Sequence, residues 1–461
     1  MSSDSPIIKK LKRVLESHQI STAPETLLVY SSDVTKNRSL PSVVVFPQST
    51  PDVVKIVNTA VELSIPITAR GAGTGMSGGA VPITGGIAIS FERMNSIIEL
   101  NVEKRYAIAE PGVITFKLQS EAAKVGLFYP PDPSSNKIST LGGNIAENAG
   151  GLRCVKYGVT SDYIAGLEYV SADGSIEYTG VMNDNNDGID LTQLFCGSEG
   201  TLGIITRAMF RLIPAPYPRR AISAEFASIT DAASTVQTIL RKGILPSILE
   251  YIDKSTLDVV TKYISLNVSE NTGAVLLIEF DDAPEKRAEN IKKTTEICES
   301  LGAIKINIAK DEEEAEKLWK LRKTISPALS RMTNGKINED VCVPRGKLVE
   351  LVNMAGRLSG ELNLPVPVYG HAGDGNLHVN FMYDTNNPDE TERVQRGVEA
   401  ALKEVVSMGG TISGEHGIGL SKLKYLPLQF SAEKIEFHRQ LKKALDPRNL
   451  LNPGKIFTTH S

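Results

Sequence analysis

Residues 70–80 read Arg-Gly-Ala-Gly-Thr-Gly-Met-Ser-Gly-Gly-Ala, the densest glycine cluster in the chain. A predicted strand, residues 65–69, leads directly into it. Because glycine has no Cβ, the main chain of such a loop can turn its N–H groups inward and come close to a phosphate. The stretch therefore predicts a diphosphate-binding loop, with a plain glycine-rich turn as the alternative.

The GxGxxG spacing inside this loop, at 73–78, also matches the fingerprint of a Rossmann dinucleotide fold. That fold requires a helix to begin where the loop ends. Residues 81–90 instead hold one proline and two glycines among β-branched residues, so they predict an extended segment. The sequence therefore argues against a Rossmann unit.

Two more polar, glycine-rich stretches follow along the chain. Residues 129–151 read YPPDPSSNKISTLGGNIAENAGG, and residues 197–203 read GSEGTLG and lead into a predicted strand at 204–210. Small and amide side chains in this density suit a planar polar ligand better than a core. Each stretch taken singly is compatible with ordinary loop chemistry, so the informative feature is their order.

Composition narrows the class of protein. The 461 residues carry 50 basic and 54 acidic side chains, a formal net charge of −4, which excludes a basic nucleic-acid binder. No apolar run reaches the ~20 residues of a membrane helix, so we expect no membrane span.

Lysines interrupt the apolar positions at 7–15, which predicts an amphipathic surface helix and not a signal peptide. The four cysteines form no CxxC pair, which argues against an iron–sulfur cluster in this chain and favours a cytoplasmic location.

Proline-rich residues 214–218 resemble a linker, and the pattern changes there. Before it, short β-branched runs predict many strands separated by turns. After it, longer helical patterns at 284–301 and 311–329 alternate with strands such as 274–280. The predicted organisation is therefore a first domain at 1–218, an α+β domain at 219–405 and a C-terminal segment at 406–461.

Residues 369–380, YGHAGDGNLHVN, predict two short strands joined by a glycine turn. Alternation puts the apolar residues 377, 379 and 381 on one face and His378 with Asn380 on the other. The turn can bring His371 and His378 to one point, where two imidazoles can bind a divalent metal. Two histidines that cap a tight hairpin are the alternative.

A second motif, residues 413–419, reads SGEHGIG. It puts Glu415 and His416 next to each other in a glycine-rich loop. Neighbouring side chains of an extended loop point apart, so one of the pair can bind metal while the other faces a substrate. A surface Glu–His pair is the alternative.

Together these motifs resemble a known family. The three glycine-rich stretches, with YGVTSDYIAGLEYV at 157–170, look like the flavin domain of the vanillyl-alcohol oxidase type. With the histidine motifs, nearly the whole chain is similar to the group that comprises D-lactate dehydrogenase, D-2-hydroxyglutarate dehydrogenase and the flavin-binding chain of glycolate oxidase. The resemblance implies an α+β fold with a two-part FAD-binding domain, an α+β cap domain that binds substrate, and a C-terminal segment that returns to the flavin.

The resemblance implies where FAD would bind. The diphosphate is expected on the first glycine loop and the isoalloxazine near the second stretch. The residues implied are Arg70, Gly71, Ala72, Gly73, Thr74, Gly75, Ser77, Pro131, Asp132, Thr140, Gly142, Gly143, Asn144, Asn148, Gly150, Gly200, Ile205 and Asn452. Some relatives tether the flavin through a histidine in the glycine loop, but the only histidine before His371 is His18, so we expect non-covalent FAD.

The resemblance also assigns roles at the second site. It implies His371, His378 and Glu415 as ligands of a divalent metal, which the donor types leave open as zinc, iron or manganese. It implies His416 as the catalytic base that also contacts substrate. The remaining implied substrate contacts are Asn380 and Arg322, whose guanidinium fork matches a carboxylate; an ordinary surface arginine is the alternative.

The expected reaction is the oxidation of a small D-2-hydroxy acid to the 2-oxo acid. Relatives that take a long dicarboxylate carry a lysine where this chain has Asn338, which favours D-lactate or glycolate over D-2-hydroxyglutarate. Electrons would pass to an electron-transferring flavoprotein or an iron–sulfur subunit. The alternatives are D-2-hydroxyglutarate dehydrogenase, a non-catalytic flavin subunit of an oxidase complex, a flavin reductase or alkyl-transfer enzyme on the same scaffold, and a metal-dependent hydrolase without flavin.

Overall fold

The computed structural model describes residues 5–457 except 36, 183–188 and 265–267. Its contacts divide the chain into two units. The first contains Met1–Gly150, Val159–Ala215 and Glu415–Ser461, and the second contains Gly151–Gly158 and Pro216–Gly414. The chain therefore changes unit after Ala215 and Gly414, close to the breaks predicted at 218 and 405, and the second unit also takes a short segment, 151–158, that no break was predicted to separate.

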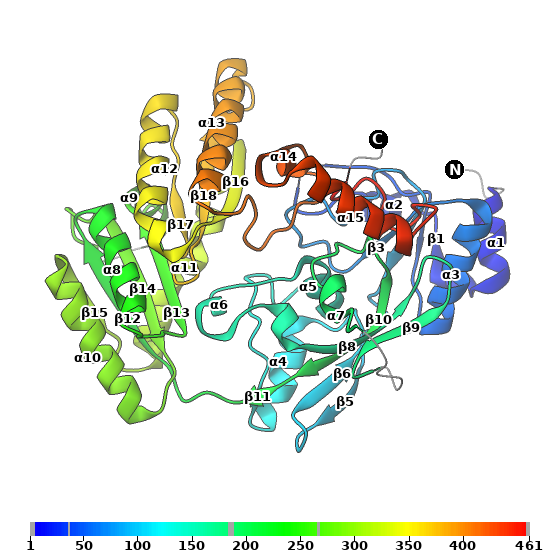
Figure 1. Cartoon of the computed structure of the whole chain (residues 1–461), viewed down its shortest axis with the longest axis horizontal. Helices are drawn as coiled ribbons and strands as arrows, with labels where there is room; N and C mark the ends of the chain where they lie inside the picture. The colour runs from blue at the N-terminus through cyan, green and yellow to red at the C-terminus, as the bar shows by residue number, and fades with distance from the viewer. Residues whose placement is uncertain (1–4, 36, 183–188, 265–267, 458–461) are drawn as a thin grey trace. The chain divides into compact units, whose positions relative to one another are not determined.

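The first unit begins with a four-stranded sheet in the order β1-β2-β4-β3 (Figure 1). Strands β2, β4 and β3 are parallel, and α3 connects β2 to β3. The glycine loop leaves β3 and is followed by β4, so the predicted absence of a helix after it is confirmed. The bounds are β1 Ile20–Ser21, β2 Val43–Val45, α3 Thr50–Leu63, β3 Ile67–Arg70 and β4 Ile87–Ser90.

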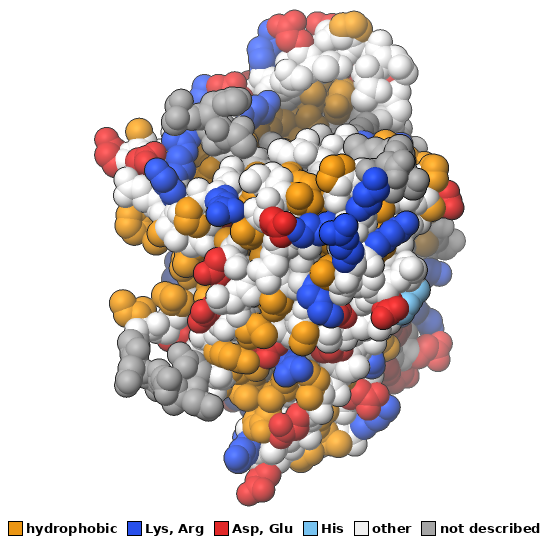
Figure 2. Space-filling model, turned by 90° about the vertical axis from the view of Figure 1, so that its right-hand side faces the viewer, with side chains coloured by type: hydrophobic (Ala, Val, Ile, Leu, Met, Phe, Trp, Pro, Cys, Tyr) orange, Lys and Arg blue, Asp and Glu red, His pale blue; other side chains and the backbone are white. Residues whose placement is uncertain are grey.

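Helix α1, Pro6–Val14, packs against α3, with its apolar side buried as the amphipathic pattern predicts. Its apolar residues Ile7, Ile8 and Leu11 are buried in a core shared with α3 and the parallel strands. Its lysines and arginine lie on the other side and are mostly exposed. Figure 2, turned so that the side of Figure 1 with α1 faces the viewer, shows lysine and arginine side chains gathered on that surface.

A second, antiparallel sheet completes the first unit, in the order β5-β6-β10-β8-β9. Its core contains fully buried Tyr129 and Phe210, whose rings meet edge to face with centroids 5.5 Å apart. The strands are β5 Ile97–Asn101, β6 Tyr106–Ala109, β8 Ile164–Val170, β9 Ile176–Gly180 and β10 Ile204–Arg211. The other elements of this unit are η1 Ser17–Gln19, α2 Pro24–Val29, α4 Thr115–Lys124, β7 Leu127–Phe128, α5 Leu141–Glu147, η2 Thr160–Tyr163, α7 Thr192–Phe195, β11 Ile213–Pro214, η4 Leu423–Tyr425, α14 Leu426–Gln429 and α15 Ala432–Leu445.

The second unit is built on a seven-stranded antiparallel sheet in the order β15-β12-β14-β13-β17-β18-β16. Helices cover both faces, so several strands are buried along their whole length. The strands are β12 Arg220–Phe226, β13 Ile248–Asp253, β14 Ala274–Phe280, β15 Ala303–Ile308, β16 Gly335–Cys342, β17 Val368–His371 and β18 Asn376–Tyr383. The helices are α6 Cys154–Tyr157, α8 Ile229–Arg241, α9 Lys254–Val260, α10 Pro284–Ser300, α11 Glu312–Leu329, η3 Arg345–Lys347, α12 Leu348–Leu362 and α13 Pro388–Ser407.

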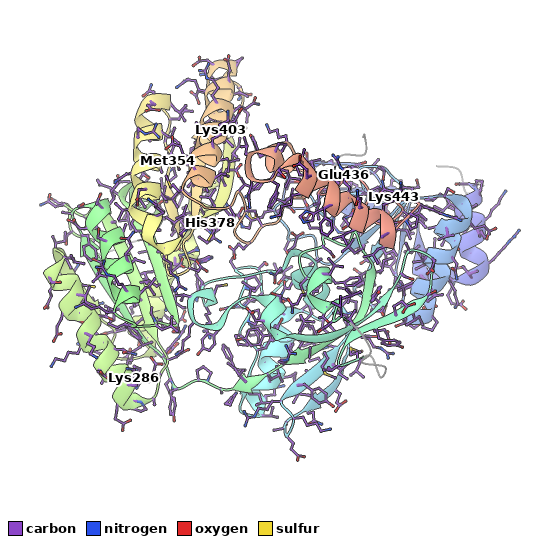
Figure 3. All side chains as sticks on the ribbon, viewed as in Figure 1. Lys286, Met354, His378, Lys403, Glu436 and Lys443 are labelled. Carbon is purple, nitrogen blue, oxygen red and sulfur yellow. The ribbon has the colours of Figure 1, made fainter. Side chains whose placement is uncertain are left out.

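The two faces of this sheet differ in chemistry. Phe381 of β18 lies under α13, where a Cβ on Gly397 would be 3.2 Å from its ring, and α12 packs beside α13. Figure 3 labels Met354 on α12, Lys403 on α13 and His378 on the strand. The opposite face packs Trp319 of α11 with Tyr369 and with residues of α9. That second face also carries the polar residues of β18, His378 and Asn380, which are candidate site residues. Within the described ranges, no helix has the length and apolarity that crossing a bilayer requires.

The C-terminal segment returns to the first sheet. The amide of Ile67 on β3 donates to the carbonyl of Leu450 at 2.7 Å, and the amide of Asn452 donates to the carbonyl of Ile67 at 2.7 Å. Buried Lys442 at the end of α15 secures the turn, because its Nζ donates to the carbonyl of Leu451 at 2.8 Å and pairs with Asp446. These bonds fix the position of Asn452.

We expect Asp446→Ala to lower the free energy of unfolding by about 3–5 kcal/mol, because Lys442 would keep a buried charge without its partner. Chemical denaturation followed by circular dichroism measures this. Glu436→Ala, an exposed acid on the same helix, serves as control and should change stability by less than about 0.5 kcal/mol. Equal effects of the two substitutions would contradict the assignment.

Candidate functional site

The first glycine loop lies against the second glycine-rich stretch within the first unit. A Cβ on Gly71 would stand 2.3 Å from Oγ1 of Thr140 and 3.7 Å from Cα of Gly143. Because no side chain fits there, only glycine allows the two stretches to approach this closely. The main chains of the two motifs therefore form one polar surface, which is the shape that close binding of a dinucleotide requires.

Arg70 braces the loop from inside. The residue is 7% exposed, and its Nη1 donates to the carbonyls of Ser32 at 2.6 Å and Ala80 at 3.4 Å. The guanidinium also lies over the ring of Tyr30, with Cζ 5.4 Å from the centroid. The side chain of Arg70 thus holds the two ends of the loop together, a role that the sequence analysis did not assign to it.

The second stretch contains a helix that the sequence analysis did not predict. Thr140 is the N-cap of α5, and its Oγ1 accepts from the amide of Gly143 at 3.2 Å. Asn144 is buried and its Nδ2 donates to Thr115 Oγ1 at 2.7 Å, while Asn148 ends the helix in the left-handed conformation and its Oδ1 accepts from Ser161. The two asparagine side chains therefore order this stretch through bonds to the protein.

Asn452 joins the glycine loop to the third stretch. Its Nδ2 donates to the carbonyls of Gly79 at 2.9 Å and Glu199 at 2.7 Å. The carbonyl of Ser77 accepts from the amide of Leu420 at 2.7 Å, which brings the segment after the SGEHGIG motif to the same place. Four motifs far apart in sequence thus meet in the first unit.

The other residues predicted to bind FAD occupy these same loops or adjoining strands. The carbonyl of Pro131 accepts from Gln119 of α4, and Asp132 accepts from Asn136 within its own turn. Gly200 takes a positive φ of 69°, and Ile205 is the second residue of β10. The remaining predicted positions in the glycine-rich stretches are Ala72, Gly73, Thr74, Gly75, Gly142 and Gly150.

Two carboxyl groups near the SGEHGIG loop, buried Glu199 and half-buried Glu147, were not predicted. Glu199 Oε1 accepts from the amides of Ile418 at 2.8 Å and Gly419 at 3.0 Å, and burial raises the pKa of Glu199. A Cβ on Gly417 would stand 2.5 Å from Oε2 of Glu147. A glutamate within a glycine-rich stretch, as in GSEGTLG, is the signal in the sequence that would have found Glu199.

The histidine hairpin of the second unit forms as predicted. Strand β17 ends at His371, the turn follows, and β18 carries His378 on the face opposite Leu377 and Phe381. Both histidines are 5% exposed. The hairpin therefore presents two buried imidazoles on the face of the sheet that α11 covers.

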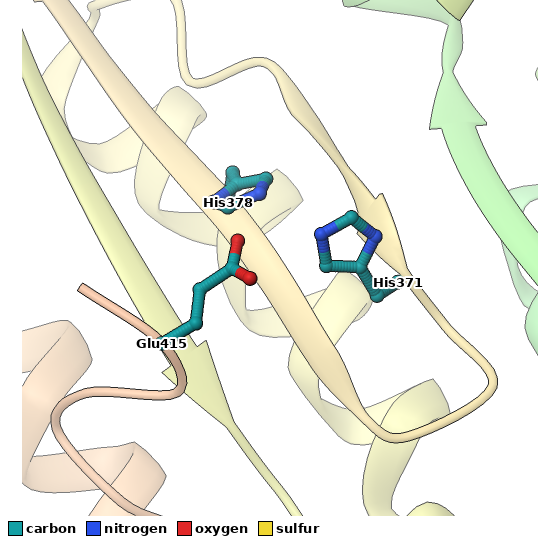
Figure 4. Close-up of side chains that lie close together, drawn as sticks. All are labelled: His371, His378 and Glu415. Carbon is teal, nitrogen blue, oxygen red and sulfur yellow. The ribbon is translucent and has the colours of Figure 1, made fainter. Parts of the chain in front are cut away.

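Glu415 lies beside this histidine pair. One ligand atom from each of His371, His378 and Glu415 lies within 4.8 Å of the others (Figure 4). Glu415 directly follows Gly414, the last residue of the second unit, whose amide donates to the carbonyl and to Oδ2 of Asp340, each at 2.9 Å. Strand β16 thus sets the start of the loop that carries Glu415.

The adjacent carboxylate and imidazole do not point apart as expected. Oε1 of Glu415 lies 3.9 Å from Nε2 of His416. The expectation assumed an extended loop, whereas residues 414–416 form a series of bends and Gly417 after them has a φ of 80°. His416 therefore lies next to the carboxylate of the histidine–glutamate group.

Arg322 is not a surface arginine. It is 9% exposed, its Nε forms an ion pair with Oε2 of Glu250, and its Cζ lies 4.8 Å from the centroid of the Tyr369 ring. The other oxygen of Glu250 lies 2.5 Å from Nδ1 of His371. Burial opposes ionisation of Glu250, but the charges and hydrogen bonds of His371 and Arg322 outweigh it and lower the pKa of Glu250 to about 2.

Glu250 was not predicted from the sequence. Its signal is a single carboxylate in an otherwise apolar strand, SILEYID at 247–253. A fully buried acid needs a charged partner, and the sequence does not say which cation meets it.

Asn380 contributes a buried acceptor to the same face. Its Nδ2 donates to the carbonyls of His378 at 2.9 Å and Pro367 at 3.3 Å, which fixes the orientation of the amide. Its Oδ1 accepts no bond from the described residues, and neither does Oδ1 of Asn338, the residue opposite it on β16. Two buried amide oxygens at one cross-strand pair suit a ligand that donates hydrogen bonds.

The two donor sets fit different groups. Two imidazoles and a carboxylate are a ligand set typical of zinc, iron or manganese with open coordination positions. The glycine loop, Thr140 and Asn452 present main-chain groups and small polar side chains, which suit a dinucleotide.

Comparison with protein families identifies both parts of the chain. Residues 41–180 match a family model described as an FAD binding domain. Residues 215–456 match a model described as the C-terminal domain of FAD-linked oxidases. The two matched segments contain the first two glycine-rich stretches, the SGEHGIG motif, Asn452 and the histidine hairpin, and the third stretch at 197–203 lies between them.

Relatives with similar sequences span nearly the whole chain. Glycolate oxidase subunit GlcD of Bacillus subtilis is 42% identical over 432 residues, 93% of this chain and 92% of the relative. D-lactate dehydrogenase of Archaeoglobus fulgidus is 39% identical over 417 residues, 90% and 91% of the two chains. D-2-hydroxyglutarate dehydrogenase of Stutzerimonas stutzeri is 34% identical over 465 residues, which cover 98% of this chain and 99% of the relative.

Among solved structures, p-cresol methylhydroxylase with substrate bound superposes with a TM-score of 0.82, covering 99% of this chain and 97% of that one at 19% identity. At this identity the likeness concerns the fold alone. The predicted fold class, α+β with an FAD-binding domain of the vanillyl-alcohol oxidase type and an α+β second domain, is confirmed.

We expect Gly71→Ala to weaken FAD binding at least about tenfold, or about 1.4 kcal/mol, because the added methyl would force Thr140 and the loop apart. Equilibrium dialysis against free FAD measures the affinity. Gly360→Ala, where an added Cβ meets nothing within 4 Å, is the matched control and should leave the affinity unchanged. A normal affinity in the Gly71 variant would mean that the flavin binds elsewhere.

Proposed function

Since this chain belongs to the family of FAD-linked oxidases, we propose that it is a flavin-dependent dehydrogenase that oxidises a small D-2-hydroxy acid, D-lactate or glycolate, to the 2-oxo acid. The observation that carries the proposal is the cluster of His371, His378 and Glu415. Arg322 of helix α11, which covers the same face of the sheet, lies over the ring of Tyr369. This combination suits a substrate with a hydroxyl group next to a carboxylate.

Each part of the substrate would have a partner in this arrangement. Arg322 would bind the carboxylate, because a guanidinium matches two carboxylate oxygens at once. Asn380 would accept a hydrogen bond through its buried Oδ1. His371, His378 and Glu415 would hold a divalent metal, with coordination positions left for the substrate.

When bound, the metal would lower the pKa of the substrate hydroxyl and FAD would accept the hydride from the adjacent carbon. His416 would take the hydroxyl proton as general base. Its Nε2 lies 3.9 Å from the proposed ligand Glu415, so base and metal site adjoin. Arg322 would keep the carboxylate in place while the proton leaves.

The polar face also bears on substrate length. Asn338 stands where relatives for a long dicarboxylate have a lysine, and it lies opposite Asn380. The nearby Lys336 instead bonds to Ser330 Oγ at 3.4 Å, at the end of α11. This favours D-lactate or glycolate; D-2-hydroxyglutarate is the second candidate, because a relative that acts on it matches 98% of this chain.

We further propose that FAD is bound without a covalent link and that electrons leave through a partner protein. The first glycine loop has no histidine to form a link. The four cysteines are spread over both units and form no disulfide. An electron-transferring flavoprotein or an iron–sulfur subunit would accept the electrons, consistent with the subunit names of two relatives. We also propose a cytoplasmic location, because the four cysteines form no CxxC pair.

A non-catalytic flavin subunit is the alternative in another class. Such a subunit would have no use for three buried metal-ligand side chains beside a buried arginine. We therefore favour an enzyme that uses both.

We expect the purified protein to be yellow and its flavin absorbance to bleach on anaerobic addition of D-lactate or glycolate. His416→Ala should retain FAD but be reduced about 10²–10⁴-fold more slowly, the usual contribution of a general base. Stopped-flow spectroscopy measures both. D-2-hydroxyglutarate and L-lactate are the comparison substrates, and a flavin that none of the four acids bleaches would refute the proposed reaction.

We expect His378→Ala to lose the bound metal and the flavin reduction together, because one of three ligands is removed. Elemental analysis of the purified variant and zinc titration of the stripped protein measure the loss. His18→Ala removes an exposed histidine and should keep both properties. Full metal content in the His378 variant would contradict the ligand assignment.

A further inference from the structure

We propose that Glu250 is a positioning residue that fixes, through its two oxygens, which nitrogen of His371 can bind metal and which edge of Arg322 faces the substrate. The inference rests on the proposed function and adds to it a residue outside the motifs. Glu250 lies in β13, next to β17 in the sheet, and is directly opposite His371 in the register.

Both oxygens of Glu250 have a partner in the proposed site. Oε1 lies 2.5 Å from His371 Nδ1, and Oε2 pairs with Arg322 Nε. The side chain is fully buried, so water does not compete for these bonds. One carboxylate therefore sets the positions of a metal ligand on one strand and of an arginine on helix α11.

The bond to His371 selects the metal-binding nitrogen. A carboxylate accepts hydrogen bonds, so Nδ1 of His371 carries the proton that it donates to Oε1. Nε2 then keeps the lone pair and is the nitrogen that binds metal. Histidines that bind metals commonly donate their other ring N–H to a carboxylate, which orients the ring and strengthens the ligand.

The bond to Arg322 selects the orientation of the guanidinium. Glu250 bonds to Nε, and the ring of Tyr369 lies 4.8 Å from Cζ. With Nε and one face of the guanidinium restrained, the two terminal nitrogens form the edge suited to a carboxylate. Glu250 thus aligns the substrate-binding edge with the metal-binding nitrogen.

Glu279 offers a matched comparison within the same sheet. It lies on neighbouring strand β14, is 1% exposed, and accepts from Trp319 Nε1 of the same helix α11 at 3.0 Å. It also pairs with Arg219, but none of its described contacts is a histidine. If Glu250 only stabilised the packing of α11, neutralising either acid would have similar effects.

The experiment compares Glu250→Gln with Glu279→Gln in the flavin-loaded protein after its metal has been removed by chelation. A glutamine has an NH2 group in place of one carboxylate oxygen, so a donor would face the N–H of either His371 or Arg322 where an acceptor now lies. Zinc titration against a chromophoric chelator gives the affinity. We expect Glu250→Gln to weaken zinc binding about 10–100-fold and Glu279→Gln to leave it unchanged. Unchanged zinc affinity in Glu250→Gln, or equal losses in both variants, would overturn the proposal.

A measurement on the unmodified chain covers the case in which Glu250→Gln does not fold. In a crystal structure of the zinc-loaded protein, we expect Nε2 of His371 on the metal and Nδ1 on Glu250. Zinc bound to Nδ1 would overturn the proposal.

Flavin bleaching by D-lactate and glycolate in the same preparations separates the two proposals. If the unmodified protein binds zinc and Glu250→Gln does not, but no acid bleaches the flavin, the substrate assignment fails and the role of Glu250 in metal binding stands. If bleaching and zinc binding both survive in Glu250→Gln, the role of Glu250 fails alone. An unmodified protein that binds none of zinc, iron and manganese would overturn both.

Discussion

The buried carboxylate of Glu250 is the interaction on which the second unit's site depends. Burying a guanidinium charge without a partner costs far more free energy than a folded domain can offset, and a buried imidazole N–H without an acceptor adds to that cost. One fully buried acid between Arg322 and His371 removes that cost for both. The sheet can therefore keep a polar row on a face that otherwise packs as an apolar core, in which Trp319 and Tyr369 lie on the same face.

The first unit depends on a different constraint. Main-chain groups of separate loops must approach one another without side chains between them. Glycine at position 71 allows the loop to touch Thr140, and Asn452 bonds to the carbonyls of two other loops. Each of these contacts joins segments more than 60 residues apart, and the C-terminal return is held by the buried pair of Lys442 and Asp446. The binding surface thus depends on long-range hydrogen bonds between loops that have little regular structure of their own.

Local pattern predicted many elements well because each had a local cause. The proline at the start of α3, the alternation in β18 and the proline and glycines after the first loop each restrict the backbone directly. Helix α5 was not predicted because its first turn contains two glycines, which disfavour a helix, although Thr140 before them is an N-cap. The predicted orientation of His416 was wrong for a similar reason, since bends at 414–416 and the positive φ of Gly417 take the place of an extended loop.

The sequence by itself determined the residue types of both sites: glycines where a phosphate can approach, and imidazoles and carboxylates where a metal can bind. These follow from side-chain chemistry, which does not depend on the fold. Only the tertiary structure decided that Glu250 meets His371 and Arg322, and that Asn452 meets the first glycine loop. Those pairings depend on strand order and on the return of the chain end, and a residue's own neighbours in sequence carry no information about either.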